Sequence, residues 1–437
     1  MGNRTRLILA LLLGLIALSV ADGATDSSRV ISASKVLATI KAGEPAEFDN
    51  CIIVGDLNFS TLEIDEPVHF NHTLFQNSVD FSLTTFNGTA AFQFSTFNGY
   101  ANFWSSTFKG NAAFQGSTFN GDAAFQSSTF KGTAAFQGST FNGYTNFQFS
   151  TFNGWASFWS STFNGYANFQ GSTFKGDAFF QSSTFNGTAY LKDTRFNTTD
   201  FTATQFNKEA SFDDTQFKGI ASFYNSRFKD DALFENTTFK DKLSLARTRY
   251  DKLYIRWSDI TKGIIYDDAA YMSLMKNFKD LGYFEDYDSC YFQYRKEHRD
   301  QSWPLVSSWD KPIRKCIDFF LEWFYGYGTK PFNALYISIA IIIVFGIFWK
   351  AIGFGGPDDT TGKDIEGWEK PHGILDILSF SITIFLSGTK LFIDPPAIPM
   401  IKGRSKSMVK KAFTFERILG ALFSILFFLA ISGTVVR

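Results

Sequence analysis

Large apolar residues recur through the first half of this chain at alternating steps of five and six residues. The series begins with Phe48, Ile53, Phe59, Ile64 and Phe70, and continues to Phe239. A period of 5.5 residues fits neither the 3.6 residues of a helical turn nor the two-residue alternation of a flat strand. The chain has 54 phenylalanines among 437 residues. So many large apolar side chains require a regular core that is extended unit by unit.

A small residue stands two places before each large one, as Ser95 does before Phe97 and Ala101 before Phe103. Each unit therefore directs one small and one large side chain inward and turns outward between them. In every second unit an extra residue falls at an Asn-Gly or Lys-Gly pair, where we expect glycine to tolerate a wider corner. Between Phe196 and Phe201 one six-residue step becomes five, and the alternation then resumes.

This pattern resembles the pentapeptide-repeat family, whose units carry a small residue two places before a central Leu or Phe. The resemblance covers about residues 48–250. It implies a β-solenoid, folded as a right-handed quadrilateral β-helix. With about 22 residues in a coil, the segment predicts roughly nine coils stacked at the strand spacing of about 4.8 Å.

Outward positions of the predicted solenoid are where a binding function could lie. The exposed aromatic candidates are Tyr100, Trp104, Tyr144, Trp155, Trp159 and Tyr166. On a polar face such side chains could bind sugars or another rigid surface, or they could simply cover corners of the solenoid. Residues 86–190 are nearly free of charge, and the whole chain has a formal net charge of −1. Mimicry of DNA by an acidic rod, an activity found in the family, is therefore not expected, and we predict no nucleic-acid partner.

The N-terminus has the pattern of an export signal. Arg4 and Arg6 precede an apolar run from Leu7 to Val20, and a small-x-small cleavage signature ends at Ala21. We expect a signal peptide over 1–21, with an uncleaved anchor as the alternative, then a cap segment over 22–47 and an extracytoplasmic solenoid. Sequons for N-glycosylation agree with that location; they are Asn58, Asn71, Asn87, Asn186, Asn197 and Asn236.

After Tyr250 the pattern becomes helical. One stripe at a period of 3.6 comprises Tyr271, Leu274, Met275, Phe278 and Leu281, and a second comprises Phe284, Tyr287, Tyr291 and Tyr294. Gly282 lies between them and fits a C-cap. This hairpin resembles a single tetratricopeptide-type unit. We expect the helical neck, 251–330, to cap the solenoid and to join it to a membrane module.

The membrane module is predicted over residues 331–437. Spans are expected at about 332–350 and 416–436, where the sequence is long and apolar. Segment 374–393 contains Asp376 and Lys390 and suits a short re-entrant helix or a third helix. Lipid is therefore an expected partner, and the protein is predicted to be integral to the cell membrane.

The order span, short helix, span resembles the two-helix pore domain of potassium channels. A potassium filter needs a run such as TVGYG, whereas the matching place here reads LSGTK, so Ser387, Gly388 and Thr389 are only candidates for a pore loop. The YGYG run, 325–328, precedes the first span and is interpreted as a turn leading to Pro331. The module could conduct ions as a homo-oligomer or serve as an anchor.

Catalytic and metal-binding patterns are not apparent in the sequence. The three cysteines and four histidines are widely spaced, without the spacing of a disulfide framework or a zinc site. We therefore predict a non-enzymatic protein with no cofactor, no metal and no catalytic residue. It would display a rigid extracytoplasmic solenoid that contacts cell-envelope polymers or surface proteins. The alternative is an ion-channel-like protein whose C-terminal module forms an oligomeric pore.

Overall fold

The structure is a computed structural model that describes residues 29–302, 311–352, 373–389, 393–396 and 406–435. The predicted signal peptide, 1–21, lies outside these ranges. The described residues form two compact units. The first extends to Ile255 and includes Asp259–Ile264, and the second comprises Arg256–Ser258 and the residues from Ile265 onward.

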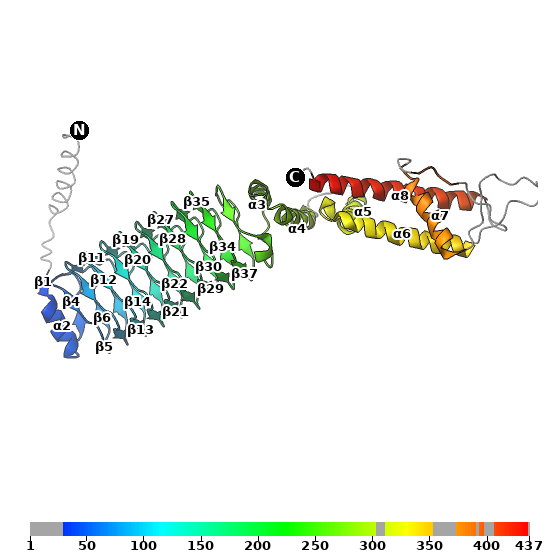
Figure 1. Ribbon diagram of the computed structural model, residues 1–437. Helices are drawn as coiled ribbons and strands as arrows, with labels where there is room; N and C mark the ends of the chain where they lie inside the picture. The colour runs from blue at the N-terminus through cyan, green and yellow to red at the C-terminus, as the bar shows by residue number, and fades with distance from the viewer. Residues whose placement is uncertain (1–28, 303–310, 353–372, 390–392, 397–405, 436–437) are drawn as a thin grey trace, which may run out of the picture. The chain divides into compact units, whose positions relative to one another are not determined.

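The first unit is a parallel β-solenoid with four sides (Figure 1). Apart from β1 (Arg29–Ser32) and β3 (Cys51–Val54), every strand has two residues. Three sheets have ten strands each: sheet A runs from β1 to β35 (Arg227–Phe228), sheet B from β2 (Ala46–Glu47) to β38 (Leu243–Ser244), and sheet C from β4 (Leu57–Asn58) to β39 (Leu253–Tyr254). Sheet D has nine, from β5 (Glu63–Ile64) to β37 (Thr238–Phe239). The predicted four-sided solenoid is confirmed, and three of its sheets exceed the expected nine coils by one strand.

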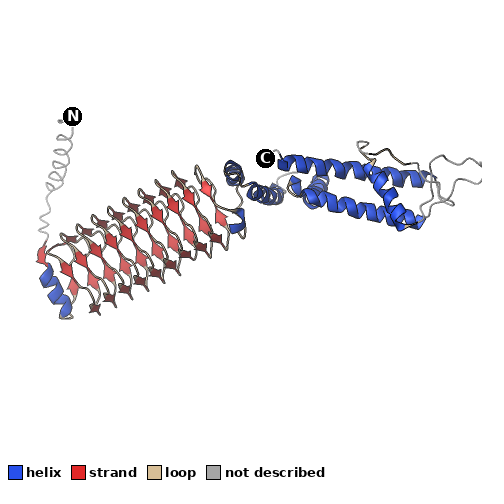
Figure 2. Cartoon of the chain, in the orientation of Figure 1, coloured by secondary structure: helices blue, strands red, loops and turns tan. Residues whose placement is uncertain are grey.

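Figure 2 shows the solenoid as rows of short strands joined by loops and turns. Each coil passes through the sheets in the order A, C, D, B. One example is β11 (Thr96–Phe97), β12 (Ala101–Asn102), β13 (Thr107–Phe108) and β14 (Ala112–Ala113), after which β15 (Thr118–Phe119) pairs with β11. We name the bends by the sheets that they join: the A–C corner, the C–D turn, the D–B corner and the B–A turn.

Phenylalanine rings fill the interior in continuous stacks. Phe97 and Phe119 lie with ring centroids 4.6 Å apart and an interplanar angle of 1°, and both are buried. Rings from neighbouring sides meet edge to face, as Phe97 and Phe103 do at 6.3 Å. Both arrangements suit the quadrupole of an aromatic ring. Each added coil therefore extends the same core, as in other solenoids.

The small inward residue differs between the sides of the solenoid. On sheets B and C it is usually Ala, whereas on sheets A and D it is Ser or Thr. The buried hydroxyl of Ser106 donates to Phe81 O at 2.6 Å, and that of Ser139 donates to Phe114 O at 2.6 Å. These columns of hydroxyl groups satisfy carbonyls inside the coil, as buried polar groups require.

The glycines of the Asn-Gly and Lys-Gly pairs have a different role from the one predicted. Their backbone is not left-handed, and a Cβ on Gly121 would lie 2.6 Å from Gly99 O in the preceding coil. Successive corners thus touch backbone to backbone, which excludes a side chain. Left-handed residues occur instead at the other two bends, once every eleven residues, and most are not glycine; Phe94, Ser105 and Asn225 are examples.

One coil is shorter than the rest. Thr173 pairs with Arg195, 22 residues away, but Ala178 pairs with Thr199, only 21 away. The separation returns to 22 where Thr199 pairs with Ala221. The D–B corner between these strands lacks the glycine, so the five-residue step from Phe196 to Phe201 is absorbed there without interrupting any sheet.

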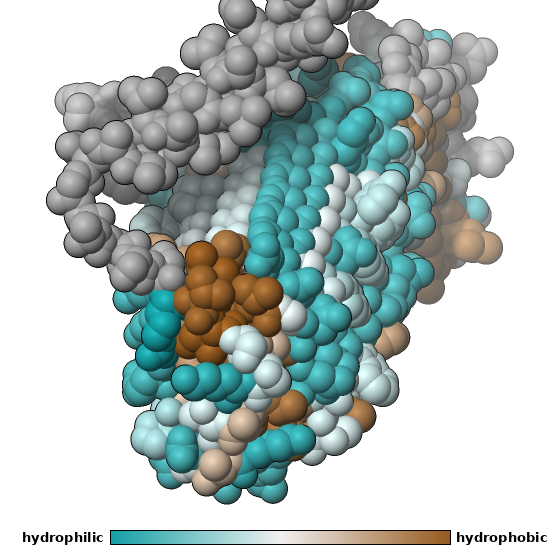
Figure 3. Space-filling view, turned by 90° about the vertical axis from the view of Figure 1, so that its left-hand side faces the viewer, coloured by the Kyte–Doolittle hydropathy of each residue, from teal (hydrophilic) through white to brown (hydrophobic). Residues whose placement is uncertain are grey.

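The N-terminal end of the solenoid carries a helix. α2 (Ala33–Lys41) begins after Ser32, whose side chain accepts a hydrogen bond from Lys35 N, and its Val36 is fully buried. This helix lies in the segment, 22–47, that we expected to shield the first coil. Figure 3 faces this end and shows columns of hydrophilic side chains running along the solenoid.

The second unit includes the first two residues of the short helix η1 (Trp257–Asp259) and a helical hairpin, α3 (Asp268–Asp280) and α4 (Phe284–Ser302). Gly282 adopts a left-handed φ of 74° after α3, as its predicted cap role requires. Most of the first predicted stripe is buried, but in α4 the prediction was wrong for Phe284, which is exposed. The buried face of α4 begins at Asp286, because Arg256 pairs with this carboxylate at 2.8 Å.

Two helices of the second unit are long and apolar enough to span a membrane, α6 (Pro331–Ile352) and α8 (Lys406–Val435). The shorter apolar helix α7 (Ile374–Leu386) contacts both. Before α6 lie α5 (Lys311–Phe320), the π-helical turn η3 (Leu321–Tyr325) and the turn η4 (Gly326–Gly328). All three residues of η4 have left-handed backbones, so the YGYG run is the predicted turn before Pro331.

Candidate functional site

The six predicted aromatic residues are all exposed, but they do not form one surface. Tyr100, Tyr144 and Tyr166 lie on the A–C corner. Trp104 lies on the C–D turn, and Trp155 and Trp159 lie on the D–B corner and the B–A turn. Trp104 and Trp159 occupy the same place in the eleven-residue pattern, but they are two and a half coils apart and therefore lie on opposite bends. The structure thus groups the three tyrosines and separates the tryptophans.

The three tyrosines share a local motif. Each is followed two residues later by an asparagine on the outward side of sheet C: Asn102, Asn146 and Asn168. Asn168 donates through Nδ2 to the hydroxyl of Tyr144 in the preceding coil at 3.1 Å. Tyr190, also on sheet C, lies with its ring centroid 6.3 Å from that of Tyr166. We call this set the tyrosine strip; it comprises Tyr100, Asn102, Tyr144, Asn146, Tyr166, Asn168 and Tyr190.

A shallow pocket of about 160 Å³ adjoins the N-terminal end of the tyrosine strip. It is lined by the carboxylates of Asp56 and Asp80, the amides of Asn58 and Asn102, and Tyr100. Partial burial, reinforced by the negative charges of Asp122 and Asp80, raises the pKa of the Tyr100 hydroxyl above its ordinary value. Tyr100 is therefore a neutral hydrogen-bond donor at physiological pH.

Asparagines form a ladder at the same A–C corner, directly after sheet A. Asn120 Nδ2 donates to Asn98 Oδ1 at 2.8 Å, and the pattern repeats in each following coil up to Asn207. The sequon residue Asn186 belongs to this ladder, so its side-chain nitrogen donates to Asn164. Among the other sequon residues, Asn58 is exposed, whereas Asn87 and Asn197 are half-buried and donate to aspartate side chains.

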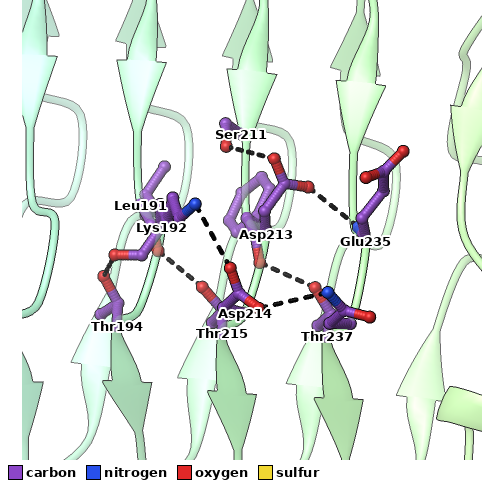
Figure 4. A network of polar contacts seen from close by, with 11 residues as sticks. Leu191, Lys192, Thr194, Ser211, Asp213, Asp214, Thr215, Glu235 and Thr237 are labelled. Atoms are coloured by element: carbon purple, nitrogen blue, oxygen red, sulfur yellow. Dashed lines mark hydrogen bonds and ion pairs between the residues drawn. The ribbon is translucent and has the colours of Figure 1, made fainter.

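The last coils of the solenoid are charged. Figure 4 shows the C–D turn there, where Lys192 pairs with Asp214 at 3.4 Å and Asp213 accepts from Glu235 N at 2.9 Å and from Ser211 Oγ at 3.0 Å. The contacts run from coil to coil along the axis. They organise the turns, and sequence reasoning about aromatic side chains did not address them.

Three possible metal ligands come together near the first coils. Ligand atoms of Glu47, Asp49 and His69 all lie within 4.8 Å of one another, although the sequence gave no metal-binding spacing. The 22-residue register brings them together, since Glu47 pairs directly with His69 in sheet B. Asp49 already accepts from Asn71 N at 2.7 Å, and both acids are exposed.

The candidate pore loop follows α7 directly. Ser387 is buried and donates through Oγ to Ile384 O at 2.8 Å. A Cβ on Gly388 would lie 2.2 Å from Arg417 O, and one on Gly420 would collide with Phe385 O. The end of α7 therefore packs backbone to backbone against α8, and Gly388 and Thr389 are half-buried there. Glycine in these places serves close helix packing.

A buried glutamate links the three helices, and sequence reasoning missed it. Glu416 of α8 is fully buried, accepts a hydrogen bond from Trp349 Nε1 of α6 at 2.7 Å, and is also contacted by the hydroxyl of Ser381 of α7. The signal available in the sequence was that it is the only acidic residue of α8.

The turn before α6 is held by α4. Tyr327 is buried, its ring lies 4.7 Å from the guanidinium of Arg295, and its hydroxyl accepts from Arg299 Nη1 at 3.4 Å. Arg299 also pairs with Glu322. A residue with positive φ is thus fixed by cation–π and polar contacts, an arrangement that the sequence pattern did not suggest.

Comparison with known families supports the repeat assignment. Four overlapping segments, 103–151, 114–162, 158–205 and 201–249, match the family described as pentapeptide repeats (9 copies). No significant match is found among curated proteins or among solved structures. Residues 103–249 of the solenoid therefore have the pentapeptide repeats that this family describes, with four parallel sheets, a period of 22 and an inward Phe preceded two places earlier by a small residue.

Proposed function

We propose that this protein is a non-enzymatic membrane protein that presents a rigid solenoid outside the cytoplasm. The solenoid binds surface or envelope components. The observation that carries the proposal is the combination of parts in one chain. A pentapeptide-repeat solenoid with exposed aromatic side chains is followed by two helices with strongly exposed apolar surfaces. A solenoid of this family is typically structural, and its regular surface suits binding more than catalysis.

The apolar surface of the last helices supports anchoring in lipid. Large side chains such as Ile343, Ile347, Ile418 and Leu429 are exposed on α6 and α8. Exposed apolar residues at this density are costly in water and favourable in a bilayer. The predicted signal peptide and the sequons support an extracytoplasmic solenoid.

Topology mapping on intact cells tests the proposal. The full-length protein, with a tag inserted within residues 353–372, is treated with protease before and after the membrane is permeabilised. We expect the solenoid to be accessible from outside and the tag only after permeabilisation. Protection of the solenoid in intact cells, together with its digestion after permeabilisation, would place it on the cytoplasmic side and refute the proposal.

An ion-channel-like function is the second candidate, and the position of α7 favours it. This short helix packs against both long helices and ends at Leu386, directly before the candidate pore loop, as a pore helix before a filter would. Reconstitution of the purified full-length protein in planar bilayers provides the test. Conduction would be supported by two results together: currents that appear only when the protein is present, and an oligomeric protein in detergent. A monomer without conductance would exclude it.

A further inference from the structure

We propose that the tyrosine strip on sheet C is a binding site for a neutral polysaccharide, which lies along the solenoid axis with one end at the Asp56–Tyr100 pocket. This inference rests on the proposed function, since it names the ligand class of the displayed solenoid. It also excludes the other exposed aromatics, Trp104, Trp155 and Trp159, from the site.

The side chains of the strip have the chemistry that sugars require. The exposed fractions of Tyr100, Tyr144 and Tyr166 are 44%, 38% and 56%, so each ring offers an open apolar surface beside a hydroxyl. Each is matched with an asparagine two residues later, whose amide both donates and accepts. Rigid tyrosines with adaptable amide groups bind polar partners at low cost in conformational entropy.

The strip is fixed before any ligand arrives. Asn168 donates to the Tyr144 hydroxyl of the preceding coil, and the ring of Tyr166 lies close to that of Tyr190. Asn102 Nδ2 donates to Asp80 at 2.9 Å, so the pocket end is also held in place. Preorganised groups lose little freedom on binding.

Charge selects among polymers. Between Asp56 and Tyr190, the A–C corner and the outward positions of sheet C contain no lysine or arginine, while Asp56, Asp80 and Asp122 supply negative charge. Polymers that carry phosphate, sulfate or uronate groups would be repelled. The lysines of this part of the solenoid, Lys109, Lys131 and Lys175, lie at the D–B corner on the other side.

The shape of the site favours a chain over a single sugar. From Tyr100 to Tyr190 the strip covers four steps between coils, about 19 Å at the spacing of neighbouring strands. It is only one side of the solenoid wide. An extended polymer running parallel to the axis can contact every coil, whereas a compact ligand would contact one or two.

The coil that contains Asp122, called coil 122 below, offers a gain-of-function test. Asp122 and Ala124 stand where the other coils have Tyr and Asn, so they interrupt the strip between Tyr100 and Tyr144. Tyr144 and Tyr166 occupy the same corner position in consecutive coils, so tyrosines fit there one coil after another. The double substitution Asp122→Tyr with Ala124→Asn should complete the strip and tighten binding.

The experiment measures binding of soluble cello-, chito-, xylo- and mannohexaose to the purified full-length protein by calorimetry, with polygalacturonate and heparin as acidic comparisons. The protein is produced in a host without N-glycosylation, because Asn58 at the pocket is also a sequon. We expect at least one neutral hexaose to bind. Each of Tyr100→Ala, Tyr144→Ala and Tyr166→Ala should weaken it about five- to tenfold, the usual range for an exposed anchor residue.

Matched controls distinguish the strip from the rest of the surface. Trp155→Ala and Trp159→Ala remove larger exposed rings outside the strip and should leave the affinity for the hexaose unchanged. The double variant Asp122→Tyr with Ala124→Asn should raise this affinity. Unchanged circular dichroism and melting temperature confirm folding of each variant. Absence of binding to every neutral hexaose, preference for the acidic polymers, or full affinity in the triple tyrosine variant would overturn the inference.

The two proposals can fail separately. If the tryptophan variants abolish binding and the tyrosine variants do not, the inference falls while a displayed binding solenoid stands. If topology mapping places the solenoid in the cytoplasm, the proposed function falls even where the strip binds a glycan in calorimetry.

Discussion

A phenylalanine in the middle of the core stacks on the equivalent rings of the two neighbouring coils. Phe147 stacks on Phe125 at 4.7 Å and on Phe169 at 5.0 Å, and it meets Phe136 and Phe158 edge to face. Removing one ring therefore opens a cavity that touches three coils. The interior has no mobile neighbour to fill it, because the surrounding rings are themselves fixed by stacking.

Truncation of such a ring should be costly. Phe147→Ala is expected to lower the free energy of unfolding by about 3–5 kcal/mol. Phe147→Leu should cost much less, because Leu191 naturally occupies the same column of the solenoid. Denaturant unfolding of the full-length protein in detergent, followed by circular dichroism, measures both; equal losses would contradict the ring-stacking account.

The two kinds of glycine should respond differently to substitution. Gly121→Ala places a Cβ 2.6 Å from the Gly99 carbonyl and should destabilise the solenoid by about 1–3 kcal/mol, as overpacking does. Gly138 has a φ of +65° but open space around it, and equivalent turns hold Asn225 and Asn236. Gly138→Asn should therefore be nearly neutral. The same unfolding assay checks the pair, and a reversed order would refute the close-contact role.

At the scale of elements, the buried Glu416 joins the three apolar helices of the second unit. Glu416→Ala would leave the buried indole N–H of Trp349 without its acceptor, a loss of about 1–3 kcal/mol. Glu416→Gln keeps an acceptor at this position and should retain most of the stability. Thermal unfolding in detergent, followed by tryptophan fluorescence, makes the comparison. Equal melting temperatures for the wild type and the alanine variant would show that the contact is dispensable.

The neck hairpin should lose a stabilising contact in acid. The hydroxyl of Tyr266 donates to Asp268 at 2.6 Å, and this bond is the main reason why the pKa of Asp268 is lower than its ordinary 3.8. A lowered pKa stabilises the fold at pH values above the ordinary one, and the contribution disappears as the pH falls through the lowered value.

Tyr266→Phe should therefore reduce stability at pH 7, and this reduction should shrink as the pH is lowered from 7 to 3. The effect is small because Asp268 is largely exposed. Thermal unfolding of both proteins across this range tests it. A difference that grows as the pH falls would have the wrong sign and would exclude the proposed cause.

The sequence predicted the sheets well because their cause is local. A small residue two places before Phe97 is enough to set which side chains face inward, whereas the four sides followed from the resemblance to the pentapeptide-repeat family. It did not predict why Gly121 is glycine, since that depends on contact with the coil beneath. Nor could the helical pattern of α4 reveal that Asp286, and not Phe284, would be buried, because the reason is a distant partner, Arg256. Glu416 was missed for the same reason.

At the scale of the whole molecule, attachment to lipid should reside entirely in the C-terminal helices. A chain ending after Ser302 keeps every strand of the solenoid and both helices of the hairpin but lacks α6 and α8. We expect the full-length protein to resist alkaline extraction from membranes and the shortened one, expressed with the same N-terminus, to be released. Retention of the shortened chain would locate an anchor before residue 302.

The eleven-residue pattern also constrains how such a gene can change in length. Sheets A and D carry the same kind of unit, and so do sheets B and C. The A–C half of a coil, rotated by 180° about the axis, therefore matches the D–B half. Unequal recombination between the near-identical repeats could add or remove copies without disturbing the core. Gain of 22 residues would lengthen the rod and keep every later side chain on its original side. Gain of eleven would carry the tyrosine strip of the later coils to the opposite side, so only whole-coil variants would preserve a continuous strip.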